Sequence, residues 1–178
     1  MAKVKIASEW LTGCAGCHMS LLDLDERLVR LAEAIEITSS PITDLKHTHD
    51  VVVGILEGCV ANSANVDVAK QMRQNCQILV ALGDCACLGG VPTMRNPLSC
   101  EEVLRRAYVE TESTVDGAIP DDDELACLLS QVRPVHEVVK VDVSLPGCPP
   151  SADAIYFALS ELLAGRIPVI AGDNLRYD

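Results

Sequence analysis

Short apolar runs alternate with segments of helical periodicity along this chain, and this alternation constrains the fold more than any other feature. Val51 to Leu56 is a continuous, mostly β-branched run, typical of a strand covered on both faces. Similar runs predict strands at 3–8, 78–82 and 138–145, and apolar spacings predict helices at 20–35, 65–75, 99–108, 124–131 and 155–165. Alternation of this kind implies right-handed crossovers and a mainly parallel sheet. We therefore expect an α/β fold, an open doubly wound sheet of flavodoxin-like type with helices on both faces.

The length of the chain bounds its organisation. With 178 residues, 49% of them apolar, the chain suits one domain that can build a full core without disulfide staples. The polar, irregular stretch 110–123 is expected to be a solvated insert, with partner docking as the alternative. No linker divides the sequence, so residues 1–178 are expected to form a single domain.

Composition argues against several classes of partner. The formal net charge is −12, and an acidic surface repels phosphate backbones and anionic membranes. Aromatic residues, the usual stacking platforms for single-stranded nucleic acid, make up 3% of the chain. No apolar run approaches the ~20 residues of a spanning helix, and neither a secretory signal nor a twin-arginine pair opens the sequence. We expect a cytoplasmic protein that binds neither nucleic acid nor membrane.

Cysteines follow three of the predicted strands at the point where each ends. Cys14 and Cys17 follow the first strand, Cys85 follows the strand at 78–82, and Cys148 follows the last. An odd total of nine cysteines in a reducing compartment argues for metal ligands or small buried hydrophobes rather than disulfides. The carboxyl ends of parallel strands share one edge, where ligands bind. The sequence therefore predicts a thiolate-bound metal site at this edge.

Two kinds of metal site compete for these thiolates. Glycines in the loops permit close approach of the backbone to a bound group. Helices that begin after Cys17 and Pro149 point backbone N–H donors at the carboxyl edge of the sheet. These donors suit an anionic iron–sulfur cluster. A structural zinc ion bound by four cysteines is the alternative. Structural zinc usually uses two close pairs, and Cys85 and Cys148 lack such partners. Spacing favours the cluster without excluding zinc.

Three loops resemble the small subunits of nickel–iron hydrogenases. The segments that match this family in order and spacing are Trp10-Leu11-Thr12-Gly13-Cys14-Ala15-Gly16-Cys17, Glu57-Gly58, Gly83-Asp84-Cys85-Ala86 with Gly89-Gly90-Val91-Pro92, and Pro146-Gly147-Cys148-Pro149-Pro150. The resemblance covers essentially the whole chain. The family of these small subunits is itself related to the family of the complex I 20 kDa subunit. It implies that Cys14, Cys17, Cys85 and Cys148 bind one proximal [4Fe–4S] cluster.

The branch of this family is indicated by two departures. Uptake-type small subunits carry a C-terminal extension and an exported N-terminus, and we expect neither here. The complex I subunit opens with two adjacent cysteines, whereas two residues separate Cys14 from Cys17 in this sequence. The resemblance implies the small subunit of a cytoplasmic NAD-reducing hydrogenase. Its partners would be a large subunit that holds the nickel–iron centre and a diaphorase that carries FMN and iron–sulfur clusters.

Other functions stay open at this point. Within the family, the acceptor could be NADP or a deazaflavin instead of NAD. Outside it, the alternatives are an FMN-binding flavodoxin-like electron carrier and a zinc-stabilised interaction module, and FMN bound in addition to the cluster is a further alternative.

Glu57 has two interpretations of equal weight. A carboxylate at the end of a buried strand needs a partner, so it could be part of a salt bridge or a helix cap. By resemblance to the Glu-Gly motif, it could instead relay protons toward the partner's metal site.

The remaining candidates have mainly structural interpretations. Cys59 and Cys87 lie in the site loops, and Cys87 is the less favoured alternative to Cys85 as a ligand. His18 could donate a hydrogen bond near the cluster or could simply begin a helix, and Trp10 could pack the core or screen the cluster. We expect buried small hydrophobes at Cys76, Cys100 and Cys127 and surface positions for His47, His49 and His136.

The resemblance also predicts the type of cluster. Some oxygen-tolerant relatives use two extra cysteines to hold an opened proximal cluster, and the matching positions here are Gly16 and Gly90. We therefore expect an ordinary cubane with a single one-electron transition.

Overall fold

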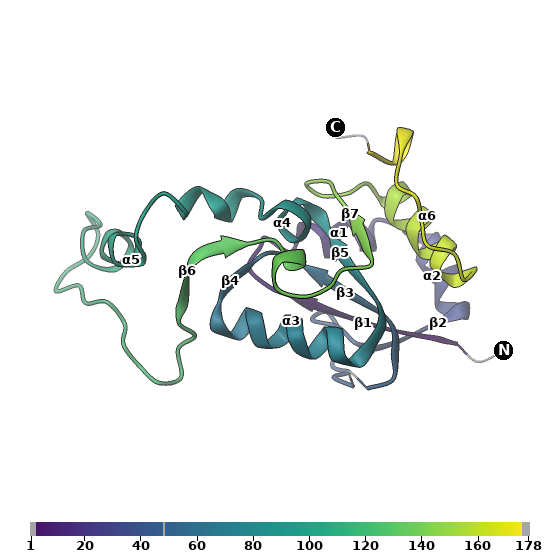
Figure 1. The fold of residues 1–178 in the computed structure, drawn as a ribbon, viewed down its shortest axis with the longest axis horizontal. Coiled ribbons are helices and arrows are strands. Elements are labelled where there is room, and N and C mark those ends of the chain that lie inside the picture. Colours follow the sequence, from purple (N-terminus) through teal and green to yellow (C-terminus); the bar gives the residue numbers. More distant parts are fainter. Residues whose placement is uncertain (1–2, 48, 176–178) are drawn as a thin grey trace.

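The computed structural model describes residues 3–47 and 49–175, and a five-stranded sheet forms its centre (Figure 1). The strand order is β2-β1-β3-β5-β7, and every neighbouring pair is parallel. Counted along the chain, this is the order 2-1-3-4-5 of flavodoxin-like sheets, so the predicted fold class is confirmed. The strands are β1 (Val4–Trp10), β2 (Ile35–Ser39), β3 (Val51–Glu57), β5 (Cys76–Leu82) and β7 (Val143–Leu145).

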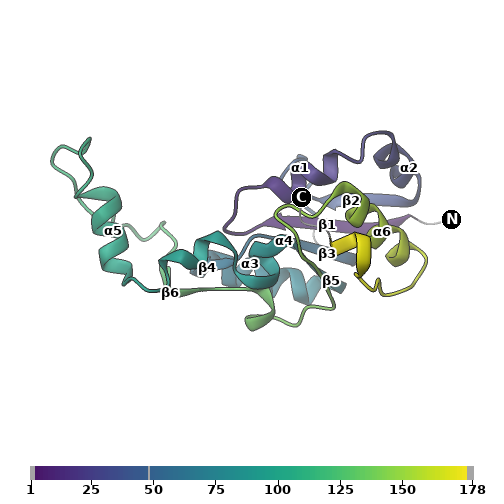
Figure 2. The same ribbon diagram turned by 90° about the horizontal axis from the view of Figure 1, so that it is seen from above.

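Helices cover both faces of this sheet (Figure 2). One apolar core lies between the sheet and α1 (Gly16–Leu22), α2 (Glu26–Ala34) and α6 (Ala152–Leu163). A second core lies between the opposite face and α3 (Ser63–Asn75) and α4 (Gly83–Leu88). Ile55 of β3 belongs to the first core and Leu56 to the second, because successive side chains of a strand point to opposite faces.

The helix predicted at 20–35 is wrong in its length. The chain forms two short helices instead, separated by a turn in which Asp25 has a φ of 50°. Leu24 in that turn is still buried, at 1% exposure, so the apolar spacing continues across the break and conceals it. The helical pattern also conceals β2, which begins at Ile35 directly after α2.

Two further predictions are corrected in the second half of the chain. The helix predicted at 124–131 is instead the strand β6 (Leu128–Arg133), which pairs antiparallel with β4 (Val60–Asn62) in a separate two-stranded sheet. Pairing of the backbone with β4 overrides the local apolar spacing here. Of the strand predicted at 138–145, only β7 forms, and it follows the short 3-10 helix η2 (Val135–Glu137).

A long excursion separates α4 from β6. It contains the 3-10 helix η1 (Val91–Arg95) and α5 (Cys100–Tyr108), and Ser99 and Glu102 close a capping box at the start of α5. The stretch 110–123 is irregular, as predicted. After α6 the described chain ends with η3 (Gly172–Leu175). Within the described residues, no helix has the length and apolar character needed to cross a membrane.

Candidate metal centre

Four cysteines line one hollow at the carboxyl edge of the parallel sheet. Cys14 and Cys17 come from the loop after β1 and the start of α1, Cys85 from α4 after β5, and Cys148 from the loop after β7. Cys17 is buried, Cys85 is half-buried, and Cys14 and Cys148 are exposed. The structure therefore brings together the four thiols that the sequence singled out, and it leaves two of them open to the surface.

The loop that carries Cys14 is fixed to the loop after β3. The Thr12 N–H donates to the Cys59 carbonyl at 3.0 Å, and the Cys59 N–H donates back to the Thr12 carbonyl at 2.8 Å. The Thr12 hydroxyl also donates to Asn65 Oδ1 at 2.8 Å. Gly13 allows this close approach, since a Cβ there would lie 3.3 Å from the Cα of Gly58.

The other two loops are joined to each other. The Asp84 N–H donates to the Gly147 carbonyl at 2.8 Å, and the Gly147 N–H donates to Asp84 Oδ1 at 2.8 Å. The Ser20 hydroxyl of α1 donates to the Pro150 carbonyl at 2.6 Å. The backbone segments that position the four thiols therefore hold one another in place.

Glycines keep the space around the sulfur atoms open. A Cβ on Gly83, whose φ is +85°, would lie 2.3 Å from Cys17 Sγ, and a Cβ on Gly90 would lie 2.7 Å from Cys85 Sγ. A Cβ on Gly16 would lie 3.2 Å from Cys14 Sγ. Side chains at these positions would press on the sulfurs, so the glycines form a cradle for whatever the thiols bind.

The neighbouring thiols influence the pKa values of Cys17 and Cys85. Burial raises the pKa of Cys17 far above its usual range, and the charges of Glu57, Cys14 and Cys85 raise it further. The pKa of Cys85 is raised by burial first and then by Cys14 and Cys148. Four neighbouring thiolates therefore need a cation to offset their repulsion.

The donor set fits an iron–sulfur cluster. Thiolates are the ligands of such clusters, and iron supplies the missing positive charge. Among residues 3–47 and 49–175, no three His, Cys, Asp or Glu side chains converge closely enough to hold a single metal ion. The thiols instead surround a hollow that is also lined by glycines, by Pro149 and by the acidic residues Glu57 and Asp84.

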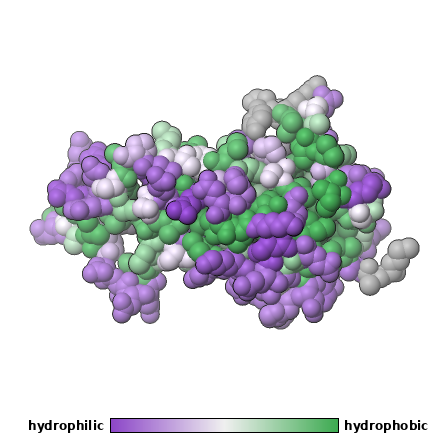
Figure 3. Space-filling model, in the orientation of Figure 1, coloured by the Kyte–Doolittle hydropathy of each residue, from purple (hydrophilic) through white to green (hydrophobic). Residues whose placement is uncertain are grey.

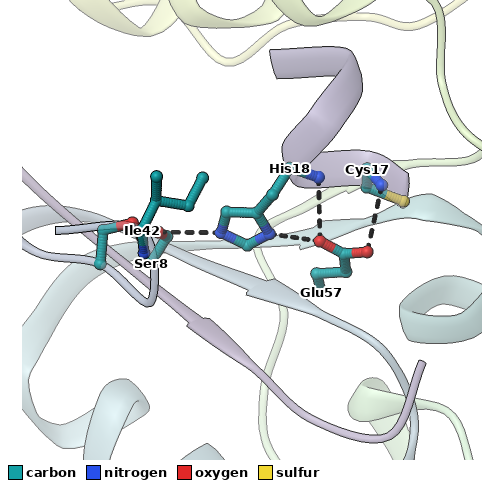
Figure 4. Close-up of polar contacts among 6 residues, drawn as sticks. Ser8, Cys17, His18, Ile42 and Glu57 are labelled. Atoms are coloured by element: carbon teal, nitrogen blue, oxygen red, sulfur yellow. Dashed lines mark hydrogen bonds and ion pairs between the residues drawn. The ribbon is translucent and has the colours of Figure 1, made fainter. Parts of the chain in front are cut away.

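A buried acid, Glu57, lines this hollow, and Figure 4 shows its contacts with Cys17 and His18. Glu57, 3% exposed, accepts the N–H of Cys17 at 3.1 Å and the N–H of His18 at 2.9 Å. The same carboxylate accepts from Nδ1 of the fully buried His18 ring. Burial opposes its charge, but the hydrogen bonds from His18 and Cys17 outweigh burial and lower the pKa of Glu57. Glu57 therefore caps the start of α1, as one of its two interpretations proposed, and it also has a buried side-chain partner in His18.

The polar contacts continue inward from His18. Its Nε2 lies 3.0 Å from the Ser8 hydroxyl, which donates to the Ser40 hydroxyl at 3.1 Å. Trp10 packs edge-on against His18, with ring centroids 5.6 Å apart, and remains 41% exposed. Sequence patterns did not identify Ser8 or Ser40, because Ser8 of β1 reaches His18, and Ser40, directly after β2, reaches Ser8, only through the packing of the fold.

The remaining cysteines and histidines have separate environments. Cys87 packs in the second core, and burial raises its pKa to about 11. Cys59 is fully buried next to Cys85, and burial followed by the charge of Cys85 raises its pKa to about 11. Cys76 is buried, as predicted. Cys100 is only half-buried, because α5 lies away from the core. The prediction for Cys127 is wrong: it is exposed, because its segment is not a helix. The three other histidines are exposed, as predicted: His47, His49 and His136.

Comparison with known sequences identifies the family of this chain. The family model described as the 20 kDa subunit of NADH ubiquinone oxidoreductase matches residues 14–162. The delta subunit of the NAD-reducing hydrogenase HoxS of Cupriavidus necator is 40% identical, over 99% of this chain and 86% of the relative. One subunit of the F420-non-reducing hydrogenase of Methanothermobacter thermautotrophicus is 36% identical over 97% of this chain, which spans only 58% of that relative.

Solved structures share the fold. A chain in the crystal structure of an NAD⁺-reducing nickel–iron hydrogenase in the H₂-reduced state superposes with a TM-score of 0.95 and 43% identity, over 99% of this chain and 100% of that chain. A nickel–iron–selenium hydrogenase chain from Desulfovibrio vulgaris Hildenborough superposes with a TM-score of 0.61 and 18% identity, over 92% of this chain and 60% of that chain. The second likeness concerns the fold alone.

Proposed function

Because this chain belongs to the family of the 20 kDa subunit of NADH ubiquinone oxidoreductase and is a hydrogenase subunit, we propose that it is the electron-transferring small subunit of an NAD-reducing nickel–iron hydrogenase. The observation that carries this proposal is the hollow lined by Cys14, Cys17, Cys85 and Cys148 at the carboxyl edge of the sheet. In this proposal the four thiolates hold one proximal [4Fe–4S] cluster. A cluster of this type supplies one-electron acceptance and donation.

Each residue of the site has a defined task in this account. The exposed Cys14 and Cys148 lie on the side from which a partner can approach, and the buried Cys17 and half-buried Cys85 face the protein interior. The paired backbone contacts among the three loops keep the four sulfurs in place. Gly83 and Gly90 leave the space that the iron and sulfide ions require.

Glu57 is proposed to pass protons to and from the side of the partner's nickel–iron centre. It borders a small cavity formed with Trp10, Leu11, Gly13 and Ala15, next to the partly exposed Trp10. The His18 ring can exchange a proton with the Glu57 carboxylate, because Nδ1 of His18 and Oε2 of Glu57 are in direct contact. The hydrogen bonds to Cys17 and His18 keep the acid oriented while it does so.

We assign the nickel–iron centre to a large subunit and the reduction of NAD to a diaphorase that carries FMN and iron–sulfur clusters. NAD is favoured over NADP or a deazaflavin by the match with the HoxS delta subunit, to which this chain is 40% identical and of which it spans 86%. The complex is proposed to be cytoplasmic.

Purification of the native complex tests this function. The complex should reduce NAD with hydrogen, and this chain should carry about four iron ions and the broad brown absorption of a cluster. The separated chain should reduce no dye with hydrogen. Zinc in place of iron would favour an interaction module, a structured yellow spectrum would favour a flavin carrier, and hydrogenase activity of the chain alone would contradict the division of labour proposed above.

A further inference from the structure

The helix α5 carries an amphipathic pattern but has no core of its own to pack against. Its apolar residues recur at spacings of three and four and therefore share one helix face, and they are Cys100, Val103, Leu104, Ala107 and Tyr108. No residue of α5 is buried, and Tyr108 is 46% exposed. Cys100, Val103 and Leu104 are half-buried, whereas Ala107 and Tyr108 are exposed. An amphipathic helix normally buries its apolar face, so the exposed part of this face is available to another molecule.

We use the term arm for residues 96–128, which include α5 and the irregular loop after it. The arm reaches out from the sheet at the end of the molecule opposite α2 (Figures 1 and 2). It exposes large apolar side chains, with Leu98 at 50%, Val115 at 86% and Leu125 at 52%. In the same part of Figure 3, hydrophobic residues lie among strongly hydrophilic ones.

The arm is continuous with the cysteine edge. Leu88, Val91 and Met94 connect α4, which carries Cys85, to the start of the arm, and they are 66%, 68% and 77% exposed. On the other side, β6 returns from the arm to pair with β4, which begins three residues after Glu57. A partner that covers the cysteine hollow beside Glu57 therefore meets the arm next.

The charge of the arm defines the chemistry of that partner. Between Arg106 and Arg133 the sequence contains seven carboxylates and no lysine or arginine. One of the seven, Glu110, pairs with Arg105. Complementary interfaces match charge of opposite sign around an apolar centre, so the surface that receives the arm needs lysine or arginine at its rim. The seven carboxylates are Glu110, Glu112, Asp116, Asp121, Asp122, Asp123 and Glu124.

We propose that the arm is a docking element for the nickel–iron subunit, which would receive the apolar face of α5 in a groove with a basic rim. This inference rests on the proposed function, which assigns the surface beside Trp10 and Glu57 to that subunit. The loop of Trp10 and the start of β4 are held together by the paired hydrogen bonds of Thr12 and Cys59. The same partner can therefore bind both the cysteine edge and the arm, and a helix in a groove is a common mode of recognition.

Charge reversal on the arm tests this proposal in the complete complex. The variant Asp121→Lys/Asp123→Lys changes two exposed carboxylates of the arm, and the matched control Glu33→Lys/Glu36→Lys changes two exposed carboxylates at the opposite end of the molecule. Each variant is co-expressed with the nickel–iron and diaphorase subunits. We expect the arm variant to associate with the nickel–iron subunit about tenfold more slowly at low salt, and the control to associate at the wild-type rate.

A second variant tests the apolar part without changing charge. Tyr108→Ser/Val115→Ser replaces the exposed Tyr108 of the α5 apolar face and the exposed Val115 of the loop after it, so it should leave the fold intact while it weakens binding of the nickel–iron subunit. The proposal is overturned if both arm variants bind that subunit like the wild type, or if they lose the diaphorase and keep the nickel–iron subunit. The iron content of each variant is measured in parallel, because an iron-free wild-type chain would refute the proposed function independently of the arm.

Discussion

Glu57 and His18 are in direct contact in the interior of the protein, and the same carboxylate accepts the backbone N–H of the ligand candidate Cys17 at 3.1 Å. This relationship gives Glu57 two tasks at once. Its hydrogen bonds to the start of α1 fix the backbone on which Cys17 sits. Its contact with the His18 ring gives it a neighbour with which a proton can be exchanged.

The substitution Glu57→Gln separates these tasks. Glutamine keeps the shape and can still accept hydrogen bonds, but it cannot titrate. If Glu57 relays protons, hydrogen–deuterium exchange by the complex should slow by about 10²–10⁴-fold, the usual contribution of a general acid–base group, while the iron content stays unchanged. Exchange at the wild-type rate across the pH range would favour a purely structural role.

Cys85 and Cys87 provide a matched pair of substitutions. Cys85 lines the hollow, whereas the Cys87 thiol donates to the Ala81 carbonyl at 3.4 Å within the second core. Cys85→Ala should lower the affinity of the site for iron by at least about 10–100-fold. This is the loss observed when a residue that only supports a metal ligand is removed, and removal of a ligand itself should cost no less. Cys87→Ala should retain iron and lose some stability. Iron analysis of both variants decides the assignment, and the reverse pattern would make Cys87 the ligand.

Gly83 offers a test of the cradle around the sulfurs. Gly83→Ala places a Cβ 2.3 Å from Cys17 Sγ at a φ of +85°. Gly165→Ala is the control, because Gly165 has a φ of +73° and its Cβ would meet nothing within 4 Å. Both variants should lose about 1–2 kcal/mol of stability from left-handed backbone strain, but only Gly83→Ala should lose iron. Equal iron contents would show that the space beside Cys17 is not needed.

Asp142 is expected to make stability depend on pH. Burial opposes its charge, but hydrogen bonds from the Leu79 N–H at 2.9 Å and from Arg73 outweigh burial and lower the pKa of Asp142 below its ordinary value of 3.8. Its contribution to stability is therefore complete above pH 3.8 and is lost as the pH falls through the lower folded-state pKa. Asp142→Asn should cost about 1–3 kcal/mol at neutral pH. Denaturant unfolding measures this cost, and the difference from the wild type should shrink in acid.

The sequence was sufficient for the parallel type of the sheet and for the meeting of the four thiols, since both depend on local patterns and one geometric rule, but it did not predict the edge strand β2. The continuous run from Val51 identifies a strand buried on both faces, and the rule that parallel strands share a carboxyl edge brings Cys14 and Cys148 together. The description of residues 1–178 as a single domain remains a prediction.

The parts that could not be predicted depend on tertiary contacts. Buried Leu24 conceals the break between α1 and α2, and pairing with β4 turns the helical pattern around Leu128 into a strand. The contact of Ser8 with His18 requires knowledge of which face of β1 meets α1. Nothing in the local sequence of α5 indicates that its apolar face lies outside the core.

Redox titration of the native complex, followed by electron paramagnetic resonance and by iron and sulfide analysis of this chain, tests the central claim most directly. The chain should carry about four iron and four sulfide ions and show a single one-electron transition, because Gly16 and Gly90 provide no extra thiolates next to Cys14 and Cys85. Zinc without sulfide would contradict the cluster itself. Two successive oxidations of the cluster in this chain would contradict its assignment as an ordinary cubane held by Cys14, Cys17, Cys85 and Cys148.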